Sequence, residues 1–310
     1  MRSKSAPRVL ELCAGAGGQA LGFEAAGFEH AILVDYDAHA CATLRMNRPY
    51  WNVLQADIER FSAGYWEGVD VVAAGLPCPP FSVAGRQLGS SDERNLFPAF
   101  LRIVGEAKPQ VAIVENVRGL LERRFSAYRE QIVGEFAAFG FTCHWKLLDA
   151  FDQGVPQRRA RSFLVALRES GEFRWPEANL SGETVGEALY ASMAVNGWQG
   201  AEAWARKANR PAPTLVGGSH KHGGPDLGPT RARRAWAELG VDGLGLADDA
   251  PGPSFQGLPR LTVEMTSKLQ SFPNDWKLAG GKTRRYRQVG NALPPKLAMA
   301  VARRIRSCLA

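Results

Sequence analysis

The chain has 310 residues, and its 38 Lys and Arg against 31 Asp and Glu give a formal net charge of +7 at pH 7. A hydrophobic content of 45% with 22% charged residues is ordinary for a globular protein, which excludes a disordered tail, a collagen-like chain and a coiled coil. Since no apolar run approaches the about 18 residues of a membrane span and the first seven residues lack an apolar core, we expect neither a membrane span nor a signal segment. The five cysteines include no C-x-x-C pair, which predicts reduced thiols and a cytoplasmic protein.

Apolar runs alternate with stretches of helical spacing through the first half of the chain. Strands that alternate with helices predict βαβ units, and hence a doubly wound, mostly parallel, Rossmann-like α/β sheet. From 168 to 257 the composition turns to Gly, Pro and scattered Trp, which predicts a small irregular second domain, and Pro294-Pro295 begin a last helix. The predicted strands are 9–13, 31–34, 69–74, 110–114, 143–148 and 162–167, and the predicted helices begin near 21, 38, 95 and 125.

A glycine-rich loop follows the first predicted strand. Gly15 and Gly17 let the backbone pass close to a ligand, with the N-terminus of the next helix facing it. Asp35 ends the second strand at an offset that suits a ribose diol, and the incomplete G-x-G-x-x-G pattern favours S-adenosylmethionine over a dinucleotide. Tyr36 is placed to stack on an adenine. The alternatives are a plain tight turn for the glycines and an ordinary half-buried Tyr36.

Three further groups lie at predicted strand ends. Cys78 follows a buried strand inside a proline-rich segment that fixes the direction of its thiol, so we interpret it as a nucleophile rather than a core thiol. Glu115 ends the next strand and is a candidate general acid, with a surface or helix-capping Glu as the alternative. Alternation along a strand places Arg159 and Arg161 on one face, where they hold an anion or a base edge or form a solvated surface run.

Taken in order, these segments resemble the DNA (cytosine-5) methyltransferase family. The glycine loop alone is a weak signal, whereas the proline–cysteine segment followed by the others is very specific. The resemblance covers about 8–167 and 258–310, and it implies a catalytic, cofactor-binding domain of 1–167 and 258–310 with a target-recognition domain of 168–257. The segments are 10–18 (LELCAGAGG), 75–85 (GLPCPPFSVAG), 114–117 (VENV), 157–161 (QRRAR), 260–276 (RLTVEMTSKLQSFPNDW) and 287–295 (RQVGNALPP).

The resemblance implies a mechanism and a cofactor site. The Cys78 thiolate attacks C6 of a flipped-out cytosine, Glu115 acts at N3, Arg161 reaches O2 and Arg159 supports the pocket. The chain departs from the family at Cys13, where an aromatic residue usually packs on the adenine, and at Pro79, where Gln is frequent. By the same resemblance the S-adenosylmethionine site is formed by Cys13, Gly15, Gly17, Asp35, Tyr36, Asp57, Ile58, Pro77 and Asn291.

Positive charge gathers in two parts of the chain. The stretch 204–236 carries a local +6 and 276–310 a local +9, so the remaining residues are net acidic. We interpret the first stretch as the DNA-reading surface, with a merely solvated loop as the alternative. His220 and His222 have no third ligand nearby, and no metal is predicted. The predicted DNA contacts are Ser82, Arg86 and Arg94 after the cysteine, and Lys221, Arg231, Arg233 and Arg234 in the basic stretch.

The sequence thus predicts a monomeric bacterial or phage enzyme that modifies double-stranded DNA in a restriction-modification system. The cognate endonuclease is expected as a genetic rather than a physical partner. The alternatives are an enzyme of the same chemistry that acts on tRNA and a catalytically silent DNA-binding paralogue, against which the intact Cys78, Glu115 and Arg161 argue. The cysteine segment excludes a Rossmann oxidoreductase.

Overall fold

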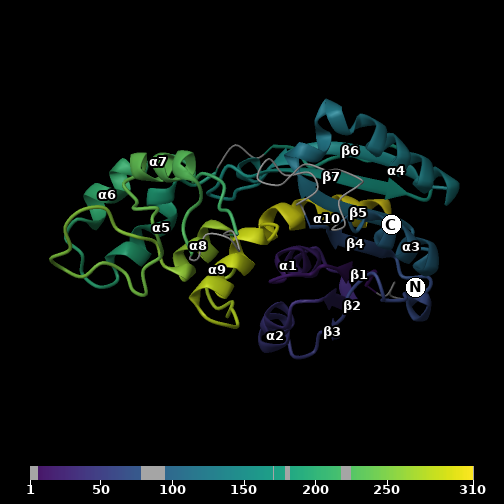
Figure 1. Ribbon diagram of the computed structural model, residues 1–310, viewed down its shortest axis with the longest axis horizontal. Coiled ribbons are helices and arrows are strands. Elements are labelled where there is room, and N and C mark those ends of the chain that lie inside the picture. Colours follow the sequence, from purple (N-terminus) through teal and green to yellow (C-terminus); the bar gives the residue numbers. More distant parts are fainter. Residues whose placement is uncertain (1–5, 78–94, 170, 179–181, 218–224, 310) are drawn as a thin grey trace. The chain divides into compact units, whose positions relative to one another are not determined.

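The structure is a computed structural model that describes residues 6–77, 95–169, 171–178, 182–217 and 225–309 (Figure 1). The chain divides into two compact units, and each is described by itself. The first unit contains 1–148, 160–176 and 298–310, and the second contains 149–159 and 177–297. The predicted domains divide the chain differently, because they assign 258–297 to the catalytic domain. That functional assignment stays a prediction.

The first unit is built on one seven-stranded sheet. Its strand order is β3-β2-β1-β4-β5-β7-β6. The pairs β1–β2, β1–β4, β2–β3 and β4–β5 are parallel, and β5–β7 is antiparallel, which confirms the mostly parallel α/β class. Only residues 150–159 separate β6 from its neighbour β7 in the sheet. This connection is shorter than the crossover that joins two parallel neighbouring strands. The strands are β1 (Arg8–Leu12), β2 (Glu29–Asp35), β3 (Val53–Gln55), β4 (Val71–Gly75), β5 (Val111–Val117), β6 (Thr142–Asp149) and β7 (Ala160–Leu167).

Helices connect and cover these strands. Because the central strands are buried on both faces, they read as continuous apolar runs in the sequence. In Figure 1, α2 lies beside β2 and β3, and α4 lies beside β6 and β7. The helices of this unit are α1 (Gly18–Ala25), α2 (Ala38–Asn47), α3 (Phe97–Ala107), α4 (Ser126–Ala138) and the short 3-10 turns η1 (Gly64–Trp66), η3 (Arg118–Leu121) and η4 (Arg123–Phe125).

Helix α10 (Pro295–Cys308) begins in the second unit and continues into the first from Ala298. It packs against α1 at Gly22, where an added Cβ would lie 2.3 Å from the Ala298 Cβ. Arg306 then donates a hydrogen bond of 2.6 Å to the Ala26 carbonyl at the end of α1. The last helix thereby covers the helix that follows the glycine loop.

The second unit is mainly helical and forms its own core. In its described residues, the stretch 168–257 that was predicted to be irregular contains three helices, of which α5 begins with a capping box between Thr184 and Glu187. The scattered Trp198, Trp204 and Trp236 meet in the core of this unit, where each is less than a tenth exposed. The helices are α5 (Val185–Ala194), α6 (Ala201–Lys207), α7 (Thr230–Glu238), α8 (Val263–Leu269), α9 (Lys282–Asn291) and the 3-10 turn η5 (Ala150–Asp152).

Within the described parts of the chain, every helix is too short or too polar to cross a membrane.

A histidine in β2 makes the first unit sensitive to acid. Burial lowers the pKa of His30 to about 4, and its Nε2 lies 3.1 Å from the Ala20 carbonyl oxygen. Since the unfolded chain binds this proton at its ordinary pKa of 6.5, stability falls as the pH drops from about 6.5 to about 4. We expect the urea midpoint to decrease between pH 7 and pH 5, and to decrease less in His30→Phe. Equal pH slopes in both proteins would contradict this origin.

Candidate functional site

The loop between β1 and α1 passes through three positive-φ residues. Cys13, Gly15 and Gly17 have φ of 53°, 54° and 84°. The left-handed conformation costs little at the two glycines, and open space lies where a Cβ of Gly15 would point. The Gly15 N–H donates to Asp35 Oδ2 at 2.7 Å, so the loop is fixed to the end of β2. This arrangement leaves an open cradle at the start of α1.

Asp35 holds the strand ends together. Its side chain is 6% exposed, and its Oδ1 accepts a hydrogen bond of 2.8 Å from the Asp37 N–H. Burial raises the pKa of this carboxyl above its ordinary value. Its backbone carbonyl also accepts from Ala56 N–H at 3.0 Å, which brings the segment of Asp57 beside it. Tyr36, the next residue, is 73% exposed.

Cys13 lies in the same loop and stays a neutral thiol. Burial raises its pKa well above the ordinary value, and the nearby Asp35 and Asp57 carboxylates raise it further. A thiol that does not ionise is a poor nucleophile. Cys13 therefore suits an apolar contact surface.

The three other predicted cofactor residues of this unit, Asp57, Ile58 and Pro77, lie on loops at the same strand ends. Asp57 Oδ1 accepts the Glu59 N–H at 3.0 Å, and the neighbouring Ile58 is 3% exposed. Pro77 follows Leu76, whose carbonyl accepts a 3.3 Å hydrogen bond from the Asn116 amide. Asn116 is 1% exposed, and the sequence predicts it only as a member of the segment 114–117 (VENV). It holds the chain where β4 leads to the segment that contains Cys78.

Glu115 and Arg161 form an ion pair at the end of β5. Arg161 Nε lies 2.9 Å from Glu115 Oε1, and both side chains are nearly buried. The antiparallel register pairs Val117 with Arg161, so the arginine reaches one pleat back to the carboxylate. A Cβ added to Gly75 would lie 3.7 Å from Glu115 Oε2 and 3.7 Å from the Cys13 carbonyl oxygen. The ends of β1, β4 and β5 therefore bring the carboxylate beside the glycine loop.

Arg159 has other partners than Arg161. Its guanidinium donates to the carbonyls of Leu215, Gly290 and Ala292 at 2.6, 2.8 and 3.1 Å, all within the second unit. The sequence placed the two arginines on one strand face, but β7 begins only at Ala160. Arg159 is 1% exposed and ties three segments of the second unit together.

Asn291 ends α9 and is exposed. It packs so closely on Gly217 that an added Cβ there would lie 1.9 Å from the Asn291 Oδ1. Its part in cofactor binding stays a prediction.

The predicted DNA contacts are described only in part. Cys78, Ser82, Arg86, Arg94 and Lys221 lie outside the described residues, as do Pro79, His220 and His222. Three arginines fall on α7. Arg231 and Arg234 are exposed, whereas Arg233 is half-buried and donates to Thr230 Oγ1 at 3.3 Å. Helix α7 therefore presents positive charge to solvent.

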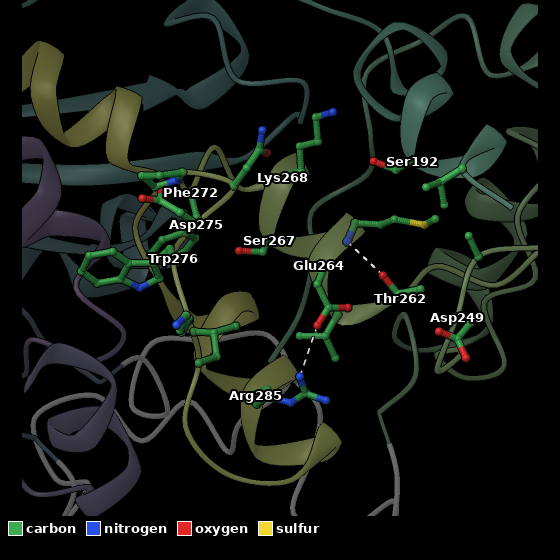
Figure 2. A pocket seen from close by; sticks show the side chains of 18 of the residues that line it. Ser192, Asp249, Thr262, Glu264, Ser267, Lys268, Phe272, Asp275, Trp276 and Arg285 are labelled. Carbon is green, nitrogen blue, oxygen red and sulfur yellow. Dashed lines mark hydrogen bonds and ion pairs between the residues drawn. The ribbon is translucent and has the colours of Figure 1, made fainter. Parts of the chain in front are cut away.

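A cleft of about 730 Å³ opens in the second unit, and no sequence pattern predicts it. Figure 2 shows the buried Ser267 hydroxyl between Trp276 and Glu264, whose carboxylate pairs with Arg285 at 3.2 Å. The cleft is lined by residues of both charges, so the charge favours no one class of ligand; these residues are Asp248, Asp249, Glu264, Asp275, Lys268, Lys277 and Arg285. In the part of the chain that the structure describes, no group of three or more His, Cys, Asp or Glu residues is placed to hold a metal.

Comparisons with known proteins match nearly the whole chain. The family model of C-5 cytosine-specific DNA methylases matches residues 7–307. The Type II methyltransferase M.NaeI of Lentzea aerocolonigenes is 50% identical over 97% of this chain and 75% of its own length. M.NgoMIV of Neisseria gonorrhoeae, also a Type II methyltransferase, is 47% identical over 97% of both chains.

Solved structures share the fold at low identity. The Dnmt2 methyltransferase of S. pombe superposes with a TM-score of 0.66 at 16% identity, covering 98% of this chain and 99% of that chain. A mutant DNMT2 of Spodoptera frugiperda gives 0.67 at 17%, covering 97% and 100%. The match of the family model over nearly all residues, together with the two relatives near half identity, places the chain: it belongs to the C-5 cytosine-specific DNA methylase family.

Proposed function

We propose that this enzyme transfers the methyl group of S-adenosylmethionine to C5 of a flipped-out cytosine within a short specific sequence of double-stranded DNA. We further propose that it is the monomeric modification enzyme of a Type II restriction-modification system, whose cognate endonuclease is its genetic partner. The names of M.NaeI and M.NgoMIV support the Type II assignment. The observation that carries the chemistry is the nearly buried Glu115–Arg161 ion pair beside the glycine loop.

The residues of the first unit fit S-adenosylmethionine. The open space at Gly15 accepts a close approach, and the Asp35 carboxylate has acceptor capacity left for a ribose diol. Ile58 and the neutral Cys13 thiol offer apolar surface to an adenine. When bound, this cofactor supplies an electrophilic methyl group on a sulfonium sulfur.

Cys78, Glu115 and Arg161 then act at C6, N3 and O2 of the base. The Cys78 sulfur forms a bond to C6, and the electron pair displaced from the C5–C6 double bond makes C5 the nucleophile for the methyl group. Glu115 holds a proton at N3 and so draws the charge that develops during the attack, while Arg161 binds O2. Loss of the C5 proton to a base restores the double bond and expels the cysteine sulfur.

This function is tested by methyl transfer to two substrates. The protein is incubated with S-adenosylmethionine labelled in its methyl group and either plasmid DNA or tRNA. We expect label in the plasmid at a short sequence that bisulfite sequencing then identifies. Label in tRNA alone would contradict the proposal.

The covalent step is tested by a second substrate. DNA with 5-fluorocytosine at the target position should form a stable adduct with the protein when the cofactor is present, because fluorine at C5 does not leave as a proton does. The adduct is measured as a slower band on a denaturing gel. Its absence, in a preparation that methylates ordinary DNA, would contradict attack by Cys78 on C6.

A further inference from the structure

Helix α3 carries an ion pair that faces the loop between β3 and η1. Arg102 and Glu106 are one turn apart, with Arg102 Nη1 2.5 Å from Glu106 Oε1. Exposed pairs of this kind usually contribute little to stability. The backbone contacts of this pair distinguish it from such a surface pair.

The pair bonds the loop at both of its ends. Arg102 Nη2 donates to the carbonyl oxygens of Ile58 and Glu59 at 2.9 and 3.3 Å. Glu106 Oε2 accepts the Ala63 N–H at 2.6 Å and the Ser62 hydroxyl at 3.0 Å. Burial works against the charge on Glu106, but the Ala63 N–H and Arg102 outweigh it and lower the pKa of this carboxyl. Glu106 is therefore charged at neutral pH.

The loop so held contains two predicted cofactor residues. Asp57 lies one residue after Ala56, whose N–H is bonded to the Asp35 carbonyl. Ile58 is buried, and its own carbonyl is an acceptor for Arg102. The loop is thus anchored to the end of β2 on one side and to α3 on the other. A small movement of α3 or the loss of Arg102 would change the place of Ile58 more than that of Asp35.

We propose that Arg102 and Glu106 are positioning residues of the S-adenosylmethionine site: through the backbone of residues 58–63 they hold Asp57 and Ile58 against the adenosine moiety. This inference rests on the proposed function. Neither side chain touches the cofactor or the reacting atoms. Their contribution should appear in cofactor affinity and not in the methyl-transfer step.

The test separates KM from kcat. In Arg102→Ala, the KM for S-adenosylmethionine and the Kd of S-adenosylhomocysteine should rise roughly 10-fold, because charge-assisted hydrogen bonds to the loop are lost. The kcat at saturating cofactor and the Kd for DNA should stay within about twofold. Arg102→Lys and Glu106→Gln each keep part of the bonding and should fall between wild type and Arg102→Ala. These two variants carry the test if Arg102→Ala does not fold.

The matched control is Glu67→Ala. Glu67 pairs at 2.7 Å with Lys108, the residue that caps the C-terminus of α3, and both side chains are more than half exposed. This control should leave the KM for S-adenosylmethionine unchanged. A lower kcat with unchanged KM, or equal effects of Arg102→Ala and Glu67→Ala, would overturn the inference. A wild-type protein that binds S-adenosylhomocysteine but methylates no DNA would instead contradict the proposed function, and the binding arm would still decide the role of Arg102.

Discussion

Glu115→Gln should lower kcat for DNA methylation by roughly 100- to 10,000-fold, the range for losing a general acid. The amide keeps the size of the side chain and one acceptor for Arg161, but it has no acidic proton to transfer to N3 of the base. Both side chains of the Glu115–Arg161 pair are nearly buried, and Arg161 Nε lies 2.9 Å from Glu115 Oε1. Truncation to Ala would leave the Arg161 charge without this partner and confound the result with unfolding, at a cost of about 3–5 kcal/mol.

Single-turnover transfer from labelled S-adenosylmethionine measures this effect without a contribution from product release. The KM for the cofactor should change less than about twofold, because the chemistry at N3 comes after cofactor binding. Glu24→Gln is the control. Glu24 also pairs with an arginine, Arg48, at 3.0 Å, but its side chain is 28% exposed. A Glu115→Gln enzyme as fast as the Glu24→Gln enzyme would remove Glu115 from the mechanism.

The sheet was largely predictable because its central strands are buried on both faces. The apolar runs near β1, β4 and β5 follow directly from that burial. Strand β3 was not predicted, since Leu54 and Gln55 at this edge are exposed and give no apolar signal. Helix α4 begins at Ser126, close to the predicted start; it buries Ile132 and Phe136, while Phe139 caps the helix and is 40% exposed.

Helices α7 and α9 of the second unit lack such a signal. Helix α7 buries only Trp236, and α9 is rich in Arg and Lys, with Tyr286 and Val289 as its apolar contacts. With so few apolar positions, periodicity does not distinguish these helices from loops. Their stability comes from packing into a core whose members are distant in the sequence.

The residues of the candidate site were likewise predictable only where their signal is local in the sequence. The glycine loop and Asp35 carry local signals, so sequence reasoning found both. The Glu115–Arg161 pair was expected only as two groups near one sheet edge, because its contact depends on the β5–β7 register. Arg102 was missed because an Arg and a Glu one turn apart on a helix are common surface features. Its bond to Ile58 joins residues 44 positions apart, which no spacing rule reveals.

Arg159→Ala should destabilise the second unit, because each buried acceptor that is left without a donor costs about 1–3 kcal/mol. Arg159 is 1% exposed, and its loss removes a donor from three carbonyl groups, of which that of Ala292 keeps the Gln270 amide as a donor. Hydrogen exchange of α9 peptides measures the local free energy of opening, and β1 peptides of the first unit serve as an internal reference. The α9 amides should exchange much faster in the variant, with β1 little changed.

Arg158→Ala is the matched control at the adjacent position. Arg158 is 54% exposed and pairs with Asp149 and Asp152 at 3.5 and 3.3 Å, so its removal should cost no more than about 1 kcal/mol. The comparison also separates two roles for Arg159. If Arg159 supports the fold, Arg159→Ala should raise the exchange rate of the α9 amides and lower the activity in proportion. Arg159→Lys, which has one ammonium in place of the planar guanidinium, should restore only part of the protection and part of the activity. An arginine that touches the target base would instead lower kcat while α9 exchange matched the Arg158→Ala protein. That result would show that the three carbonyl contacts are not what makes Arg159 necessary.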